Sequence, residues 1–389
     1  MATGIETEIA AVTNFPPQAT VSAGRIPGLD GLRGVASLLV VMYHFGSHIL
    51  QGNSAAVTFL HRVSGGLFSG VDLFFVLSGF LIGGILIDHG SSAHYYKTFY
   101  GRRICRIFPL YYLLLISYIV TLLILGHKTS GLGRLFEHPL PAISYWTFTQ
   151  NFEMSAYSSF GPIWLAGTWS LAIEEQFYLI LPVFARRLSL KALTISSMAC
   201  VVIAPLTRLL IYYYKFPGIS AYVLLIARCD SLALGVLVAI ALRRRQVWFA
   251  RYRRGLPWLA ATLGLLAVVH MYRPHPYFVK FTFADHSLLG LYYACLLCSV
   301  LAGPGMAHSR FLSTPLMRGL GDMAYSTYLI HPILLCLVFR LLTGADPNLR
   351  GIESIFPLTL ALIATFAIAK SSWQCFEKPI LRIGRQFQY

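Results

Sequence analysis

Apolar runs long enough to cross a bilayer recur along the whole chain and are separated by short polar segments. About 20 mostly apolar residues span the hydrocarbon core as an α-helix. The sequence therefore predicts ten transmembrane helices, at residues 32–50, 71–88, 105–126, 167–185, 192–213, 221–242, 256–272, 287–303, 322–342 and 354–375. The stretch 139–152 is shorter and more polar, and we expect it to lie at the interface or to be re-entrant.

Composition agrees with this pattern. Of the 389 residues, 56% are hydrophobic and only 12% are charged, whereas soluble domains are about one-quarter charged. No internal repeat or additional soluble domain is visible. The sequence thus predicts an all-α polytopic membrane protein with a single transmembrane domain over residues 26–385 and a short C-terminal tail at 386–389.

The first 25 residues have a different character. They contain Glu6, Glu8 and the pair Pro16-Pro17, and they lack a basic segment followed by an apolar core. This pattern argues against a cleaved signal peptide. We expect residues 1–25 to form a disordered cytoplasmic tail.

The net charge of +16 comes from 31 Lys and Arg against 15 Asp and Glu. When the N-terminus is placed in the cytoplasm, most of these basic residues fall on the cytoplasmic side. This asymmetry predicts that both termini are cytoplasmic, and it explains the charge without a nucleic-acid partner. The 7 Cys are scattered, and the pair Cys295 and Cys298 lies in an apolar run, so neither a disulfide framework nor a metal site is predicted.

Ionisable side chains inside these apolar runs are the main anomaly, because such groups are costly in hydrocarbon and normally face a protein cavity. In LDGLRGVASLLVVMYHF, Arg33 and His44 are eleven positions apart. On a helix they lie on one face, separated by about 16 Å along the axis. Arg33 is therefore expected at the cytoplasmic rim and His44 beyond the membrane midplane.

Other predicted helices send polar groups toward the depth of His44. Together they predict a central polar chamber, whose expected members are Ser78, Glu174, Glu175, Arg228, Asp230, Tyr325, Tyr328 and His331.

Purely structural interpretations of these residues are also open. A lone intramembrane His is often a helix–helix hydrogen-bond partner. Arg228 and Asp230 are two positions apart and do not face each other on a helix, so each is expected to pair with another helix. The SGFLIGG segment is typical of small-residue packing. A carboxylate and an imidazole at matching depth nevertheless favour catalysis or proton-coupled transport over packing.

A basic cluster precedes the third predicted helix, in YKTFYGRRICRIFPLYY. Arg102, Arg103 and Arg106 lie there within about one helical turn, on the same side as Arg33. They could anchor the helix to anionic lipid, but guanidinium groups also bind phosphate well. A ligand with a polyphosphate head and a long thin arm, such as acyl-CoA, fits arginines at the rim and a reactive centre deeper in the membrane.

Several ordered motifs together resemble the acyltransferase-3 family, integral membrane enzymes that O-acetylate bacterial surface polysaccharides and some secondary metabolites. The motifs cover residues 25 to 385 and read LDGLRGVASLLVVMYH, FFVLSGFLI, FYGRRICRIFPLYY, TWSLAIEEQFY, ARCDSLALG, AYSTYLIHP and FEKPILR.

The resemblance implies a ten-helix domain that uses cytoplasmic acyl-CoA as co-substrate, with no permanently bound cofactor. His44 matches the family's essential histidine and Arg33 its partner arginine. Arg103 and Arg106 match an RxxR pair associated with donor binding. Glu174 matches the glutamate of the WSLxxExxFY motif.

We therefore expect an acyl-CoA-dependent O-acyltransferase of the bacterial inner membrane, acting on a hydroxyl of a surface or exported polysaccharide such as an exopolysaccharide or lipopolysaccharide. His44 is the predicted general base, and Glu174 is predicted to orient its ring. An acyl relay through His44 or Ser78 is an alternative. A secondary metabolite or a lipid as acceptor, or proton-coupled transport without group transfer, also remains open.

Overall fold

The computed structural model describes residues 26–46, 59–60, 64–244, 246–271, 284–303, 305–349 and 351–389. The predicted N-terminal tail, residues 1–25, lies outside this part of the chain. The described residues are almost entirely helical, and no strand is found among them. The predicted all-α class is therefore confirmed.

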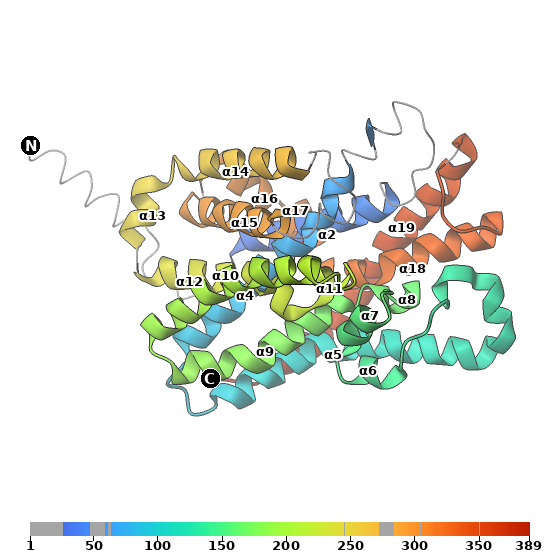
Figure 1. Ribbon diagram of the computed structural model, residues 1–389, viewed down its shortest axis with the longest axis horizontal. Coiled ribbons are helices and arrows are strands. Elements are labelled where there is room, and N and C mark those ends of the chain that lie inside the picture. The colour runs from blue at the N-terminus through green and yellow to red at the C-terminus, as the bar shows by residue number, and fades with distance from the viewer. Residues whose placement is uncertain are drawn as a thin grey trace, which may run out of the picture.

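Each of the ten predicted spans overlaps a helix of the structure (Figure 1). These helices are α2 (Pro27–Phe45), α4 (Gly70–Asp88), α5 (Tyr95–Leu125), α9 (Trp169–Arg187), α10 (Leu190–Tyr213), α12 (Leu225–Arg244), α14 (Leu256–Met271), α15 (Asp285–Ala302), α18 (Ala324–Thr343) and α19 (Ile355–Ser372).

Seven helical segments of the described residues are long and apolar enough to cross a bilayer. They contain α4, α5, α10, α12, α15, α18 and α19. The other three do not meet that criterion, since α14 is only 16 residues long and α2 and α9 carry ionisable side chains. The chain is thus a multispanning membrane protein, whereas the predicted number of ten spans stays a prediction.

The connections consist of short helices. The stretch 139–152, which was not predicted to span, contains α6 (Ala142–Trp146) and the start of α7 (Gln150–Ala156). Neither is long enough to cross a membrane. The remaining short elements are η1 (Gly66–Ser69), η2 (Gly126–Leu135), α8 (Ile163–Ala166), α11 (Ser220–Val223), α13 (Gln246–Tyr252), α16 (Ala307–Leu312), α17 (Pro315–Asp322), η3 (Ile352–Ser354), η4 (Trp373–Glu377) and α20 (Lys378–Gly384).

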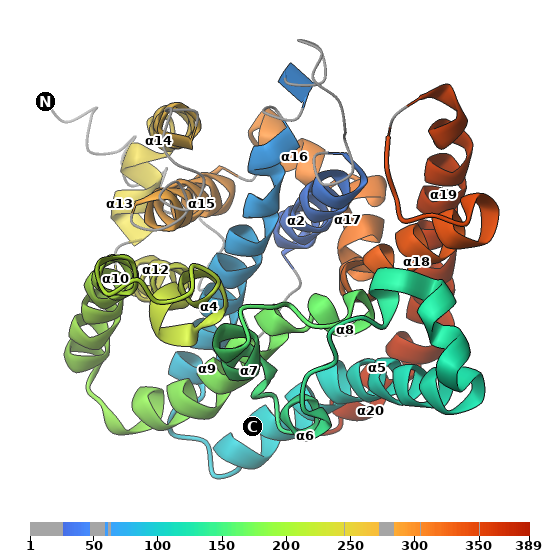
Figure 2. The same ribbon diagram turned by 45° about the vertical axis from the view of Figure 1, so that its right-hand side comes forward.

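Helix α4 lies at the centre of the bundle and packs against α2, α9, α12 and α15 (Figure 2). Helix α18 packs against α19 and α2, and α20 packs against α5. Most residues of α4 are apolar, and those that are buried lie on all sides of the helix. This is the pattern expected of a helix surrounded by other helices.

Glycines allow α4 and α12 to approach closely. A side chain at Gly79 would overlap the backbone carbonyl of Leu232, and one at Gly235 would overlap the carbonyl of Val76. Backbone contact of this kind is the usual role of small residues between membrane helices. The interpretation of SGFLIGG as a packing segment is therefore confirmed at Gly79.

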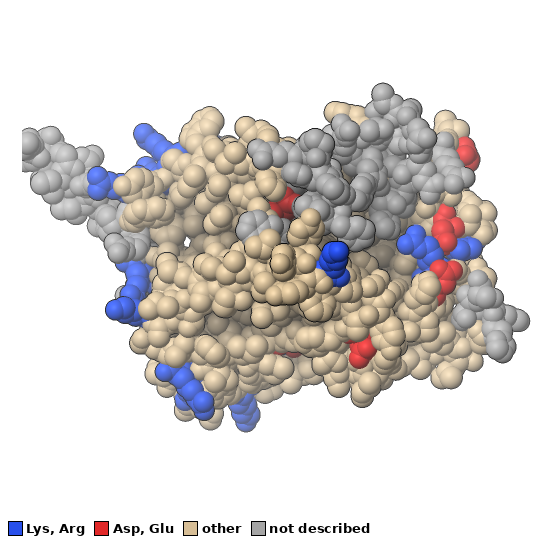
Figure 3. Space-filling model, viewed as in Figure 1, with Lys and Arg blue, Asp and Glu red and all other residues tan. Residues whose placement is uncertain are grey.

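Basic side chains on the face shown in Figure 3 lie mainly at the end of the molecule near α13 and the C-terminus, while most acidic side chains lie toward the opposite end. Helices α9 and α12 both finish with two arginines, Arg186 with Arg187 and Arg243 with Arg244.

Candidate active site

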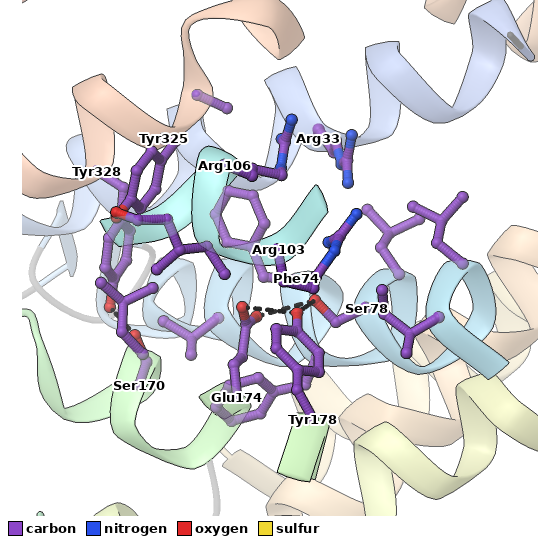
Figure 4. Close-up of a pocket in the computed structure, with 18 of the residues that line it drawn as sticks. Arg33, Phe74, Ser78, Arg103, Arg106, Ser170, Glu174, Tyr178, Tyr325 and Tyr328 are labelled. Carbon is purple, nitrogen blue, oxygen red and sulfur yellow. Dashed lines mark hydrogen bonds between the residues drawn. The ribbon is translucent and has the colours of Figure 1, made fainter. Parts of the chain in front are cut away.

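A cavity of about 280 Å³ opens among helices α2, α4, α5, α9 and α18. Its apolar wall is formed mainly by residues of α4, including Leu77, Leu81 and Ile85. The polar residues that line it are Arg33, Ser78, Arg103, Arg106, Ser170, Glu174, Tyr178, Tyr325 and Tyr328 (Figure 4).

One stripe of α9 supplies three of these side chains. Ser170, Glu174 and Tyr178 follow at intervals of four residues, so they lie on the same face of the helix. Glu175 is one position off the stripe and does not line the cavity. Its Oε1 is buried without a hydrogen bond among the described residues.

Hydroxyl groups hold the Glu174 carboxylate. Ser78 donates a hydrogen bond to Oε1 at 2.9 Å, and the Tyr178 hydroxyl lies 3.0 Å from Oε2. The same Tyr178 hydroxyl is 3.1 Å from Ser78 Oγ. These three groups form a closed network that joins α4 to α9, and a carboxylate needs such partners at this depth.

Three guanidinium groups face the carboxylate across the cavity (Figure 4). Arg103 and Arg106 are three positions apart on α5, and Arg33 reaches the same cavity from α2. Arg103 also lies over the Tyr178 ring, 5.9 Å from its centroid. Among the described residues none of the three arginines forms an ion pair, so the cluster keeps donors for an anionic ligand.

Arg102 does not line this cavity. Its Nε donates to the carbonyl of Phe387 at 2.9 Å, and its guanidinium lies over the Tyr389 ring at 5.1 Å. The structure therefore gives Arg102 a contact with the C-terminal segment. The predicted donor-binding role of Arg102 has no support from this placement.

Two tyrosines of α18 close another side of the cavity. The Tyr325 hydroxyl donates to the carbonyl of Ile107 on α5 at 2.9 Å. The Tyr328 hydroxyl lies 2.6 Å from Ser170 Oγ. Both predicted chamber tyrosines thus line the cavity and connect α18 to its neighbours.

His44 and His331 form a pair next to this cavity rather than in its lining. Nδ1 of His44 lies 3.2 Å from Nε2 of His331. The His331 ring is 6.1 Å from the Tyr328 ring, measured between centroids, and Tyr328 itself lines the cavity, so the pair adjoins the cavity on its Tyr328 side.

The predicted contact between Glu174 and His44 is not found among the described residues. Glu174 accepts from Ser78 and Tyr178 instead, and the nearest ring to His44 on α18 is that of His331. Matching depth along two helices did not imply contact, because the Glu174 side chain points toward α4.

Arg228 and Asp230 belong to a separate buried network, and each pairs with another helix as predicted. Arg228 forms an ion pair with Asp72 of α4 at 2.9 Å, and Asp230 forms one with Arg208 of α10, also at 2.9 Å. All four side chains are fully buried. His286 of α15 lies 3.4 Å from the second oxygen of Asp72.

Three residues in or near the candidate site were not predicted from the sequence. Ser170 and Tyr178 had a usable signal, since both lie four residues from Glu174 on one helix face. Glu377, in the FEKPILR motif, accepts from Ser372 at 3.1 Å, is nearly buried and lies close enough for its charge to act on Arg106. It lies in the π-helical turn η4, a local geometry that is common at functional sites but that sequence patterns do not reveal.

The protein is thus a multispanning helical protein with an arginine-rich cavity beside the partly buried carboxylate of Glu174. The chain belongs to the acyltransferase-3 family, because the family model described as an acyltransferase domain matches residues 26–370.

Relatives support the same assignment. The chain is 29% identical to YrhL of Bacillus subtilis strain 168 over 382 residues, which are 92% of this chain and 55% of YrhL. It is 28% identical over 380 residues to the peptidoglycan O-acetyltransferase OatA of Listeria monocytogenes, covering 92% of this chain and 56% of that protein.

The O-acetyltransferase OatA of Staphylococcus aureus strain NCTC 8325 is 26% identical over 395 positions, with 92% of this chain and 58% of the relative covered. The chain therefore spans little more than half the length of these relatives. No solved structure matches it.

Proposed function

We propose that the protein is a membrane O-acyltransferase that moves an acyl group, in the simplest case acetyl, from acyl-CoA to a hydroxyl of a cell-surface glycan. The observation that carries the proposal is the cavity in which Arg33, Arg103 and Arg106 face an apolar wall and a hydroxyl-bound Glu174. The family and the activities in the names of the two OatA relatives support the same reaction class.

The arginine cluster suits the charged head of an acyl-CoA. Guanidinium groups bind phosphate through paired N–H donors, and three of them offer a site for more than one phosphate. The apolar residues of α4 then offer a surface for the extended pantetheine arm. We propose that the thioester end reaches the Tyr328 side of the cavity, next to His44 and His331.

His44 is the proposed general base. It takes the proton of the acceptor hydroxyl while the oxygen attacks the thioester carbonyl carbon, and the C–S bond breaks. The imidazolium then returns the proton to the departing thiolate, so the products are the acyl ester and CoA. General-base catalysis of this kind is typically worth about 10²–10⁴-fold in rate.

The charge distribution supports an orientation for this proposal. Under the positive-inside rule, the basic end with Arg186, Arg187, Arg243 and Arg244 would lie on the cytoplasmic side of a bacterial plasma membrane. CoA would then enter from the cytoplasm, and the glycan would approach the His44 side from the opposite face. Peptidoglycan, the substrate named for the Listeria relative, is the first acceptor to test.

The test uses the purified full chain in vesicles with radiolabelled acetyl-CoA and peptidoglycan fragments. We expect release of CoA, labelled ester on the glycan, and loss of both in His44→Gln. CoA release with label on lipid or on a small hydroxylated metabolite would replace the acceptor but keep the reaction. Proton movement across the vesicle without consumption of acetyl-CoA would overturn the proposal in favour of transport.

A further inference from the structure

The two histidines at membrane depth touch each other across a helix interface. His44 is on α2 and His331 on α18, and their rings meet edge to face with centroids 4.8 Å apart. Nδ1 of His44 lies 3.2 Å from Nε2 of His331. His331 is 1% exposed, so its ring has little freedom to turn.

Backbone carbonyls decide which nitrogen of each ring carries the proton. Nδ1 of His331 lies 3.0 Å from the carbonyl of Thr327, and Nδ1 of His44 lies 2.9 Å from the carbonyl of Val40. A carbonyl oxygen can only accept, so both Nδ1 atoms must be protonated. In a neutral His331 ring, Nε2 is then an acceptor.

The contact between the rings therefore has a direction. The proton on Nδ1 of His44 is shared between the Val40 carbonyl and the lone pair on Nε2 of His331. This leaves the lone pair of the neutral His44 ring on Nε2. The nitrogen with the lone pair is the one that can act as a base.

We propose that His331 is a positioning residue that holds the base His44 in its Nδ1-protonated tautomer and accepts the hydrogen bond that strengthens when His44 becomes imidazolium. This role, in which an acceptor behind the base fixes its ring, is the one filled by a carboxylate in hydrolytic triads. Here a neutral imidazole fills it. The inference rests on the proposed function and assigns the orienting role to His331 instead of Glu174.

The proton balance of the reaction agrees with this arrangement. The acceptor hydroxyl gives its proton to Nε2 of His44, the hydroxyl oxygen bonds to the acyl carbon, and the thioester C–S bond breaks. Nε2 of His44 then gives the proton to the thiolate of CoA. His331 keeps its own proton on Nδ1 throughout and exchanges none with substrate.

The tautomer can be measured without any turnover. In protein labelled with ¹⁵N at histidine, the His44 and His331 signals are assigned from their loss in His44→Gln and His331→Gln. We expect protonated Nδ1 and unprotonated Nε2 in both neutral rings. A proton on Nε2 of either ring would overturn the inference, whatever the activity of the protein.

A matched pair of variants tests the positioning role. The Gln side chain places an acceptor near the former Nε2, whereas Asn reaches only the former Nδ1 position. For His331→Asn we expect kcat to fall about 10- to 100-fold, less than for loss of the base itself, with KM for acetyl-CoA unchanged. His331→Gln should recover most of that loss.

The outcomes separate the two proposals. Equal kcat values for the Asn and Gln variants would mean that His331 only fills space, and the positioning role would fail while acyl transfer stands. If the wild-type protein consumes no acetyl-CoA although the ¹⁵N signals show the expected tautomers, the proposed function fails together with the catalytic role of His331.

Discussion

Ser78 on α4 donates a hydrogen bond of 2.9 Å to Oε1 of Glu174 on α9, and this bond joins two helices across the floor of the cavity. In Ser78→Ala one carboxylate oxygen loses its donor in a partly buried site. We expect the free energy of unfolding in mixed micelles to fall by about 1–3 kcal/mol. Ser78→Thr keeps the hydroxyl and is the control. Equal stability of the Ala variant and the wild type would contradict the assigned bond.

The same variant tests the acyl-serine alternative. Direct transfer through His44 predicts that Ser78→Ala still consumes acetyl-CoA and that peptides from the wild-type protein carry no acyl group on Ser78. Mass spectrometry after rapid quenching of the reaction checks this. An acylated Ser78 peptide, together with an inactive Ala variant, would favour the relay.

Arg103 and Arg106 are predicted to bind the phosphates of the donor. Each substitution to Gln removes one charge-assisted contact, worth about 1.5–3 kcal/mol, so KM for acetyl-CoA should rise about 10- to 100-fold. Acetyl-pantetheine lacks the nucleotide, and with it the variants and the wild type should differ little. Arg187→Gln, an exposed arginine at the end of α9, is the control. Equal KM effects with both donors would argue against phosphate binding.

Removing one partner of the ion pair between Asp72 and Arg228 is predicted to lower the free energy of unfolding strongly. Both side chains are fully buried, so Asp72→Asn leaves an uncompensated guanidinium and should cost about 3–5 kcal/mol. Replacing both partners by apolar residues should recover much of this cost.

A partly exposed pair provides the comparison. Arg340 and Asp346 lie 2.8 Å apart with side chains 18% and 31% exposed, and Arg340→Gln should cost about 0–1 kcal/mol. The free energy of unfolding of the variants measures the contrast. Similar costs at the two pairs would show that the buried pair is hydrated.

The close approach of α4 and α12 predicts a strong effect of one methyl group. In Gly79→Ala the new Cβ overlaps the Leu232 carbonyl, and separating the helices should cost about 1–3 kcal/mol or more. Gly319→Ala, in α17, meets open space and should be neutral or slightly stabilising in its helix. Thermal unfolding of the two variants provides the measurement, and equal midpoints would refute the predicted overlap.

Local patterns predicted the positions of the ten long helices because each is a mostly apolar run, although only seven lie in segments long and apolar enough to cross a bilayer. Helix periodicity also suffices to place Glu174 with Ser170 and Tyr178 on one face. The partner of a buried charged side chain cannot be predicted from such local patterns. Nothing near Arg228 in the sequence points to Asp72, which is 156 positions away, because their contact depends on how α4 and α12 pack.

Depth alone was a poor guide to contact. His44 and Glu174 were expected at one level and therefore together, yet the side chain of Glu174 points toward Ser78 and His44 meets His331. Rotation of each helix about its axis decides such contacts. The packing of neighbouring helices sets that rotation, so it cannot be predicted from the spacing of residues within one helix.

The sequence separation between the partners of each buried ion pair determines when the two partners can meet during synthesis of the chain. Arg208 and Asp230 are 22 positions apart on consecutive long helices, so they can meet within one hairpin as it leaves the ribosome. Asp72 is synthesised long before Arg228, and an unpaired carboxylate in the bilayer core costs about 2.5–3.5 kcal/mol. Asp72 therefore gains its ion-pair partner only after α12, 156 positions further along the chain, has been synthesised.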